Sequence, residues 1–193
     1  DCGRILRGLQ CEKGFGQFVE NVLSEKNTPA YLVQELVKYF PSTFNDTGKI
    51  KSGETVYLFK KAQLVAGELY KNLGQRSESQ SKLAQFISSW TRDDVSSLTV
   101  FVDNVLPAML VKEKVLTLDP ELESSIQNNK ALPAGPKETE LRAVALHACE
   151  LIVAKASGAY NAYELDYYLW GALGKEPEHR QFERHATKDT IYY

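Results

Sequence analysis

The sequence predicts an all-α protein with a single domain over residues 1–193. Apolar residues recur at helical spacing in most segments, proline and glycine separate those segments, and the polar connections between them are short. The length of 193 residues and the hydrophobic share of 43% suit one sizeable globular domain. We therefore expect helices packed around one core.

The first predicted helices lie before residue 75. The opening residues 1–6 look like the middle of a helix, so we expect that the sequence starts within a longer natural protein. A helix begins at Thr28-Pro29, because a capping threonine followed by proline is a typical helix start, and Pro41 ends it. Residues 54–59 alternate weakly and form either a short strand or an extended approach to the next helix; we favour the extended approach. That next helix is expected over residues 60–73.

Further helices are predicted in the rest of the chain. Residues 82–90 form a short helix or turn, and Asp119-Pro120 starts another helix with acidic residues in its first turn. The longest helical pattern covers residues 138–156, a further helix covers 161–172, and a charged tail covers 175–188. We expect the inner side of the longest helix to carry Leu141, Val144, Ala145, Ala148, Leu151 and Ile152.

Asp103 is the only ionisable residue in a long apolar run over residues 95–111. A carboxylate in such a run is either desolvated, with altered acidity, or held by a specific partner. If the run is helical, Pro107 lacks the N–H that would bond the carbonyl of Asp103, and Asp103 shares an inward stripe with Leu106 and Leu110. A structural role as a buried cap or ion-pair partner and a catalytic role both stay open.

Two further places could carry chemistry. Asp166 shares a helical stripe with Leu169 and Trp170, so we expect it to point inward. Trp170 and Tyr168, taken singly, are better interpreted as core aromatics than as ligand contacts. Lys60-Lys61 open a helix, where the dipole disfavours cations. They are either a solvated pair or a cation directed at a phosphate or a carboxylate.

Several other classes of protein are disfavoured. A net charge of −2 gives no reason to expect long nucleic acid as a partner, and no segment has the length and purity of a membrane-spanning helix. The three cysteines are too scattered for a disulfide framework or a zinc site, and reduced thiols suit the cytoplasm, with an organelle left open. The histidines lack helical metal spacing, and neither a Gly-rich phosphate loop nor a Gly-x-Ser-x-Gly elbow occurs.

Several blocks together resemble the queuosine salvage family of queuosine 5′-phosphate N-glycosylase/hydrolases. Their order and approximate spacing are kept across nearly the whole chain, so the combination is specific although each block alone is weak. The blocks are Phe40-Pro41-Ser42 followed by Asp46, Lys60-Lys61-Ala62-Gln63-Leu64, Leu98-Thr99-Val100-Phe101-Val102-Asp103, Glu138-Thr139-Glu140-Leu141-Arg142, Leu165-Asp166-Tyr167-Tyr168-Leu169-Trp170 and the ending Ile191-Tyr192-Tyr193.

The resemblance implies a helical fold related to that of DNA glycosylases, with this chain as the C-terminal part of a longer architecture. It implies hydrolysis of the bond between a deazapurine base and ribose 5-phosphate, which releases queuine for reuse in tRNA and needs no cofactor. Asp103 matches the family's catalytic aspartate, Lys60 matches a ligand-binding lysine, and Asp166 matches an acid expected at the base. Phe101 and Trp170, which belong to the same blocks, are expected to contact the substrate.

A second hypothesis is a catalytically eroded homologue that acts as a structural subunit or protein-interaction module. After the aspartate the family has Tyr-Arg-Val-Pro-Gln, whereas this chain has Asn104-Val105-Leu106-Pro107-Ala108. Loss of the arginine removes a group that gives affinity for phosphate or base. The enzyme hypothesis predicts a small nucleotide as partner, and the eroded homologue predicts protein partners. The acids retained in apolar surroundings favour the enzyme.

Overall fold

The structure, a computed structural model, describes residues 2–76, 80–171, 183–188, 190 and 191. Contacts within the chain divide it into two compact units: Asp1–Asn45 with Lys61–Leu98, and Asp46–Lys60 with Thr99–Tyr193. The single domain expected over residues 1–193 stays a prediction.

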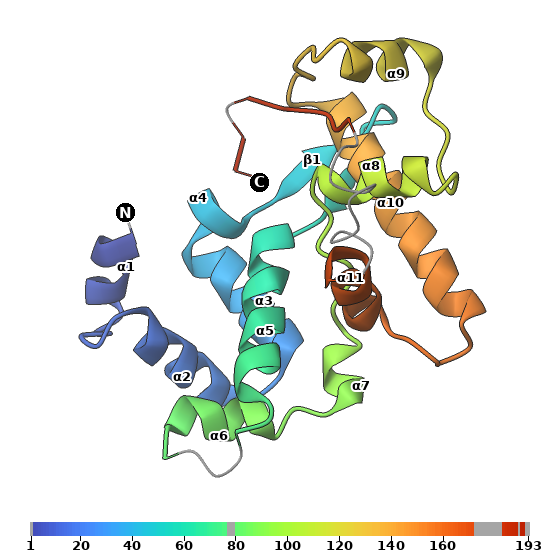
Figure 1. Cartoon of the computed structure of the whole chain (residues 1–193). Helices are drawn as coiled ribbons and strands as arrows, with labels where there is room; N and C mark the ends of the chain where they lie inside the picture. Colours follow the sequence, from blue (N-terminus) through green and yellow to red (C-terminus); the bar gives the residue numbers. More distant parts are fainter. Residues whose placement is uncertain (1, 77–79, 172–182, 189, 192–193) are drawn as a thin grey trace. The chain divides into compact units, whose positions relative to one another are not determined.

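The first unit is helical throughout its described part. Helix α2 packs against α3 and α6, and α3 also contacts α4 and α7 (Figure 1). Thr28 caps α3 as predicted, because its hydroxyl accepts the N–H of Tyr31 at 3.3 Å and Pro29 is the first helical residue. The helices are α1 (Cys2–Gly8), α2 (Phe15–Glu25), α3 (Pro29–Tyr39), α4 (Pro41–Phe44), α6 (Lys82–Ser88), α7 (Arg92–Val95) and all but the first residue of α5 (Lys60–Leu73).

The second unit is organised around its longest helix, α10, drawn in orange in Figure 1. Helix α10 contacts α8, α11 and strand β1. Asp119 caps α9 as predicted, because its carboxylate accepts the N–H groups of Glu121 and Leu122. The elements are β1 (Thr47–Lys49), β2 (Thr55–Tyr57), α8 (Val105–Lys112), α9 (Pro120–Gln127), α10 (Pro136–Lys155) and α11 (Ala162–Gly171).

The strands β1 and β2 correct the all-α prediction. They pair antiparallel, with Gly48 opposite Val56, so the extended approach favoured for residues 54–59 was wrong and the short strand was right. The turn between the strands contains Gly53 at a φ of 92°, which favours glycine. Gly48 lets β1 lie close to α10, because a Cβ at this position would collide with the side chain of Thr139. The remaining fold is mainly helical, as expected.

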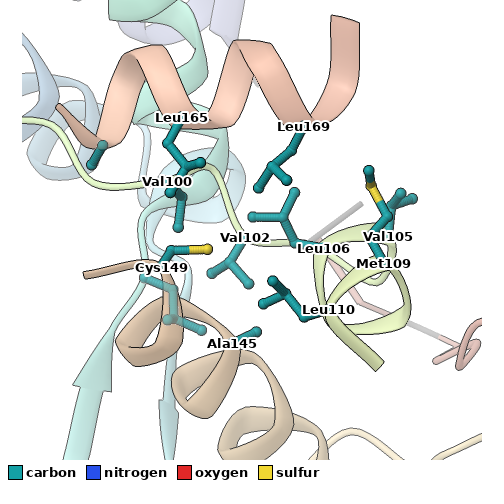
Figure 2. Close-up of a cluster of buried hydrophobic side chains, with 12 residues drawn as sticks. Val100, Val102, Val105, Leu106, Met109, Leu110, Ala145, Cys149, Leu165 and Leu169 are labelled. Carbon is teal, nitrogen blue, oxygen red and sulfur yellow. The ribbon is translucent and has the colours of Figure 1, made fainter. Parts of the chain in front are cut away.

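The hydrophobic core of the second unit lies between α8, α10, α11 and the segment that precedes α8 (Figure 2). Val144 and Leu151, expected on the inner side of α10, are instead 51% and 53% exposed. Apolar residues occur around most of this helix, so its sequence does not identify the buried side. The core consists of Leu58, Val100, Val102, Val105, Leu106, Met109, Leu110, Ala145, Cys149, Ala162, Leu165 and Leu169.

Two predictions fall partly on undescribed positions. Most of the charged tail over residues 175–188, and Tyr192 and Tyr193 of the final block, lie outside the described residues. Among the helices that are described, none combines the length and the apolar character that crossing a membrane requires.

Candidate functional site

Asp103 lies two residues before Val105, the first residue of α8, and accepts hydrogen bonds from the first turn of that helix. Its Oδ1 atom accepts the N–H of Val105 at 2.7 Å and the N–H of Leu106 at 3.4 Å. The condition that the run is helical at Asp103 is not met, since α8 begins only at Val105. Pro107 lies in the first turn, where its missing N–H would have had no helical partner. The inward orientation is confirmed, because Asp103 is 4% exposed.

Lys60, the first residue of α5, forms an ion pair with Asp103. Its Nζ atom lies 3.5 Å from Oδ2 of Asp103, and the two side chains are 14% and 6% exposed. The interpretation of Lys60 as a cation directed at a carboxylate is confirmed, and the solvated alternative was wrong for this residue. Asp103 therefore uses one oxygen as a helix cap and the other in an ion pair. Both structural roles considered for Asp103 are present.

Asp166, on α11, is held against the segment that carries Asp103. Its Oδ1 atom accepts the N–H of Phe101 at 2.8 Å, and the residue is 3% exposed, as predicted. The pKa of Asp166 is raised to about 7, mainly by burial and also by the negative charge of Asp103, against the opposing effects of the Phe101 hydrogen bond and Lys60. Asp166 therefore interacts electrostatically with both Asp103 and Lys60. Asp166 holds its proton up to about neutral pH and could donate it there.

Aromatic side chains border Asp166. The ring of Phe101 is buried and meets Tyr163 and Tyr167 edge-on, at centroid distances of 6.4 and 6.2 Å. Trp170 and Tyr168 are 41% and 55% exposed, so their interpretation as core aromatics was wrong. Helix α11 buries Leu165, Asp166 and Leu169 on one side, which leaves Trp170 at the margin of that side. No contact among the described residues joins Trp170 to the three charged groups.

Beside this cluster, Arg142 of α10 is completely buried. Its two terminal nitrogens donate to the two carboxylate oxygens of Asp46, which is a bidentate pair. Arg142 also donates to the carbonyl of Val102, from Nε at 3.2 Å and from Nη2 at 2.9 Å. Asp46 in turn accepts the backbone N–H of Lys60 at 3.2 Å. The pair therefore contacts the backbone beside both Asp103 and Lys60.

Glu138 and His185 extend these buried charges. Oε1 of Glu138 lies 3.6 Å from Nη1 of Arg142 and 4.0 Å from Nε2 of His185. Burial, followed by the charge of Arg142, lowers the pKa of His185 to about 4, so this imidazole is neutral near pH 7. The residue is held on its backbone as well, because its carbonyl accepts the side-chain N–H of Asn104 at 2.9 Å.

Sequence patterns did not single out Asp46, Glu138, Arg142 or His185 as site residues. The available signal was Glu138 and Arg142 at a spacing of four on one helix, which places opposite charges side by side. Tyr163 and Tyr167 have the same spacing and were missed in the same way. Neither pattern indicates burial, which depends on the elements that cover α10 and α11.

The described residues contain no group of three or more His, Cys, Asp and Glu that could hold a metal ion. A hollow of about 740 Å³ lies beside α9 and α10, lined by residues such as Lys51, Leu122 and Glu140. Asp103 and Lys60 do not line this hollow. The groups that could take part in a reaction are therefore Asp103, which is paired with a cation, and Asp166, which stays protonated up to about neutral pH.

These features define a mainly helical protein with two buried acids, a lysine and adjacent aromatic rings at one place. The family model described as "Queuosine salvage protein" matches residues 2–193. The chain belongs to this family.

Curated relatives carry the name queuosine 5′-phosphate N-glycosylase/hydrolase. The protein from Dictyostelium discoideum is 34% identical over 92% of this chain and 52% of its own length. The one from Sphaerobacter thermophilus is 29% identical over 98% of this chain and 56% of its own length. The one from Bos taurus is 28% identical over 100% of this chain and 55% of its own length. The chain spans about half the length of the curated relatives it matches.

Proposed function

We propose that this chain takes part in the hydrolysis of the N-glycosidic bond of queuosine 5′-phosphate, which releases queuine for tRNA modification. The observation that carries the proposal is the meeting of Lys60, Asp103 and Asp166. These residues come from three separate blocks of the family resemblance and lie together in buried surroundings. The names of the relatives support the same reaction.

Each acid has a separate role in the proposed reaction. Water attacks the anomeric carbon as the bond to the base breaks, and the transition state has oxocarbenium character. Asp103 stabilises that positive charge or accepts a proton from the attacking water. Asp166, which keeps its proton up to about pH 7, donates a proton to the departing base. The hydroxyl of water thus ends on the ribose, and a proton ends on queuine.

The remaining predicted residues bind substrate in this proposal. Lys60 is a cation that the negatively charged nucleotide attracts. Phe101 is the proposed contact to the base, and its buried ring packs against Tyr163 and Tyr167. Trp170 is exposed and available for a ligand contact. No cofactor takes part. We also expect a DNA-glycosylase-like arrangement of the helices and a cytoplasmic location.

The names of the relatives do not support the eroded-homologue hypothesis. Its motive was the loss of the family's tyrosine and arginine after Asp103. The relatives are named as hydrolases, Asp103 and Asp166 are buried, and Lys60 is half-buried beside Asp103.

Incubation with queuosine 5′-phosphate tests the proposal, with queuine release measured for the wild type and Asp103→Asn. Residues 1–193 are tested alone and together with any flanking residues that the gene encodes. Asparagine keeps an oxygen for the cap of α8 but loses the charge, so we expect kcat to fall about 100-fold or more. No queuine release from either wild-type form would refute the proposed function.

Asp119→Asn is the matched control. Asp119 caps α9 through two N–H groups, at 3.0 and 3.3 Å, much as Asp103 caps α8. Loss of a cap charge alone should therefore affect both variants alike. Equal rates for Asp103→Asn and Asp119→Asn would remove Asp103 from the chemistry, although the reaction itself would stand.

A further inference from the structure

Arg142 joins two backbone segments that carry the proposed site residues. On one side it donates two hydrogen bonds to the carbonyl of Val102, the residue before Asp103. On the other side it donates a hydrogen bond to each carboxylate oxygen of Asp46. These contacts use its Nε, Nη1 and Nη2 atoms together. A planar guanidinium fixes the directions of such bonds, whereas the ammonium of lysine does not.

Asp46 holds the turn that leads to Lys60. Its backbone carbonyl accepts the N–H groups of Leu58 and Phe59, both at 3.0 Å, and its carboxylate accepts the N–H of Lys60 at 3.2 Å. Phe59 has a φ of 48°, in the left-handed region that is unfavourable for a bulky residue. Such a conformation persists only where the surrounding contacts impose it. The orientation of Lys60 therefore depends on Asp46.

We propose that Arg142, together with Asp46, is a positioning residue that sets the separation of the Lys60 ammonium and the Asp103 carboxylate. The expected effect on catalysis rests on the proposed function. The positioning of Lys60 and Asp103 by Arg142 does not depend on it. A buried ion pair contributes little net stability compared with apolar residues of similar size. What apolar residues could not supply is the simultaneous bonding of the Val102 carbonyl and the Asp46 carboxylate.

The titration of Asp166 tests the geometry without any substrate. Carboxyl-carbon NMR follows this titration, and the groups that face Asp166 are Lys60, Asp103, the N–H of Phe101 and the thiol of Cys149. The pKa of Cys149 is raised to about 12, so the thiol stays neutral throughout. Because Lys60 lowers the pKa of Asp166, Lys60→Met should raise it.

Arg142→Lys keeps the positive charge but loses the planar fork. In the Arg142→Lys protein, Lys60 should be displaced and should affect Asp166 less. Lys60→Met should then raise the pKa of Asp166 by roughly half as much as it does in the wild type, or by less. An unchanged increase would overturn the proposal. Asp46→Asn, which keeps the shape of the side chain, serves as the second variant if Arg142→Lys does not fold. The same criterion applies to it.

Glu138→Gln is the matched control. Glu138 lies 3.6 Å from Arg142 and is equally buried, and it forms ion pairs with Arg142 and His185. A general loss of buried charge around Arg142 would affect this variant as much as Arg142→Lys. Positioning predicts instead that Glu138→Gln keeps the full response to Lys60→Met. Equal loss in both variants would contradict the proposal.

Kinetics then give the catalytic consequence. With queuosine 5′-phosphate, Arg142→Lys should lower kcat about 10- to 100-fold with a smaller change in KM, because misplaced groups impair the transition state most. Glu138→Gln should lower kcat less than Arg142→Lys does. If the wild type releases no queuine, the proposed function fails, while the Asp166 titration still decides whether Arg142 positions Lys60 and Asp103.

Discussion

Two of the ion pairs in the second unit differ in character. In the Asp46–Arg142 pair the side chains are 3% and 1% exposed, and both carboxylate oxygens are bonded. In the Lys60–Asp103 pair the side chains are 6% exposed for Asp103 and 14% for Lys60, and a single 3.5 Å contact joins them. We call the Asp46–Arg142 pair the closed pair, because both carboxylate oxygens are bonded and both side chains are buried. We call the Lys60–Asp103 pair the looser pair, because it has one long contact and is nearer to solvent.

The difference indicates what each pair can do. A charged hydrogen bond of full strength measures about 2.7–2.9 Å, so the 3.5 Å contact leaves Lys60 able to bond a further acceptor. The donors of Arg142 are already directed at Asp46 and Val102. We therefore interpret the closed pair as organising the backbone and the looser pair as the one available to a ligand.

Arg142→Met should have the largest effect, because it leaves the carboxylate of Asp46 buried without its cation. We expect the free energy of unfolding to fall by about 3–5 kcal/mol, measured by urea denaturation. The control is Lys137→Met, which removes an ion pair with Glu121 at 3.3 Å in which the two side chains are 62% and 80% exposed. That control should cost at most about 1 kcal/mol. Similar losses in both variants would contradict the contrast between closed and exposed pairs.

The next prediction concerns pH and the acid beside the looser pair. Unfolded Asp166 loses its proton near its ordinary pKa of 3.8, whereas the folded protein keeps it to about 7. Between these values the folded state binds more protons, so this group's stabilisation is lost as pH rises, by at most about 1.4 kcal/mol per pH unit. Asp166→Asn should remove this loss. Relative to the wild type, its stability should therefore rise with pH from about 4 to 7.

His185, beside the closed pair, should act in the opposite direction. Unfolded histidine gains its proton near 6.5, but folded His185 does so only at about 4, so stability is lost as pH falls through that range. His185→Gln should remove this loss, and its stability relative to the wild type should fall as pH rises from about 4 to 6.5. Urea denaturation at several pH values measures both variants. Slopes of the same sign would refute the assignment of these two groups.

Much of the fold followed from local sequence signals. Thr28-Pro29 and Asp119-Pro120 carry their own helix starts, because a capping side chain and proline act within one turn. The two strands were harder to predict, since a three-residue strand is stable only through its partner and through the contact of Gly48 with Thr139. Val144 and Leu151 show the same limit, because burial depends on which elements cover a helix.

The candidate site was predictable where a charge lies in an apolar run. Asp103 stood out for that reason, Asp166 stood out because it shares a helical stripe with Leu169 and Trp170, and both are buried. Arg142 and Asp46 did not stand out, because their pairing across 96 positions of sequence depends on the packing of α10 against β1. Their family blocks were visible, but no local pattern joins them. Long-range pairs of this kind require the three-dimensional structure.

The smallest expected effect comes from a larger residue at Gly48, where β1 lies against Thr139 of α10. Gly48→Ala places a methyl group against Thr139, one turn from Arg142 on α10, so β1 or α10 must shift. We expect the free energy of unfolding to fall by about 1–3 kcal/mol in urea denaturation. Gly16→Ala, in α2 with open space around it, should instead be neutral or stabilising by up to about 1 kcal/mol.

A second substitution locates the strain from Gly48→Ala. Thr139→Ala removes the atoms that the new methyl group meets, so the double variant should be more stable than the sum of the single effects predicts. Strictly additive losses would show that the methyl group is accommodated elsewhere. If the strain does reach α10, the Asp166 titration should also lose part of its response to Lys60→Met, because Asp46 adjoins β1 and Arg142 lies on α10.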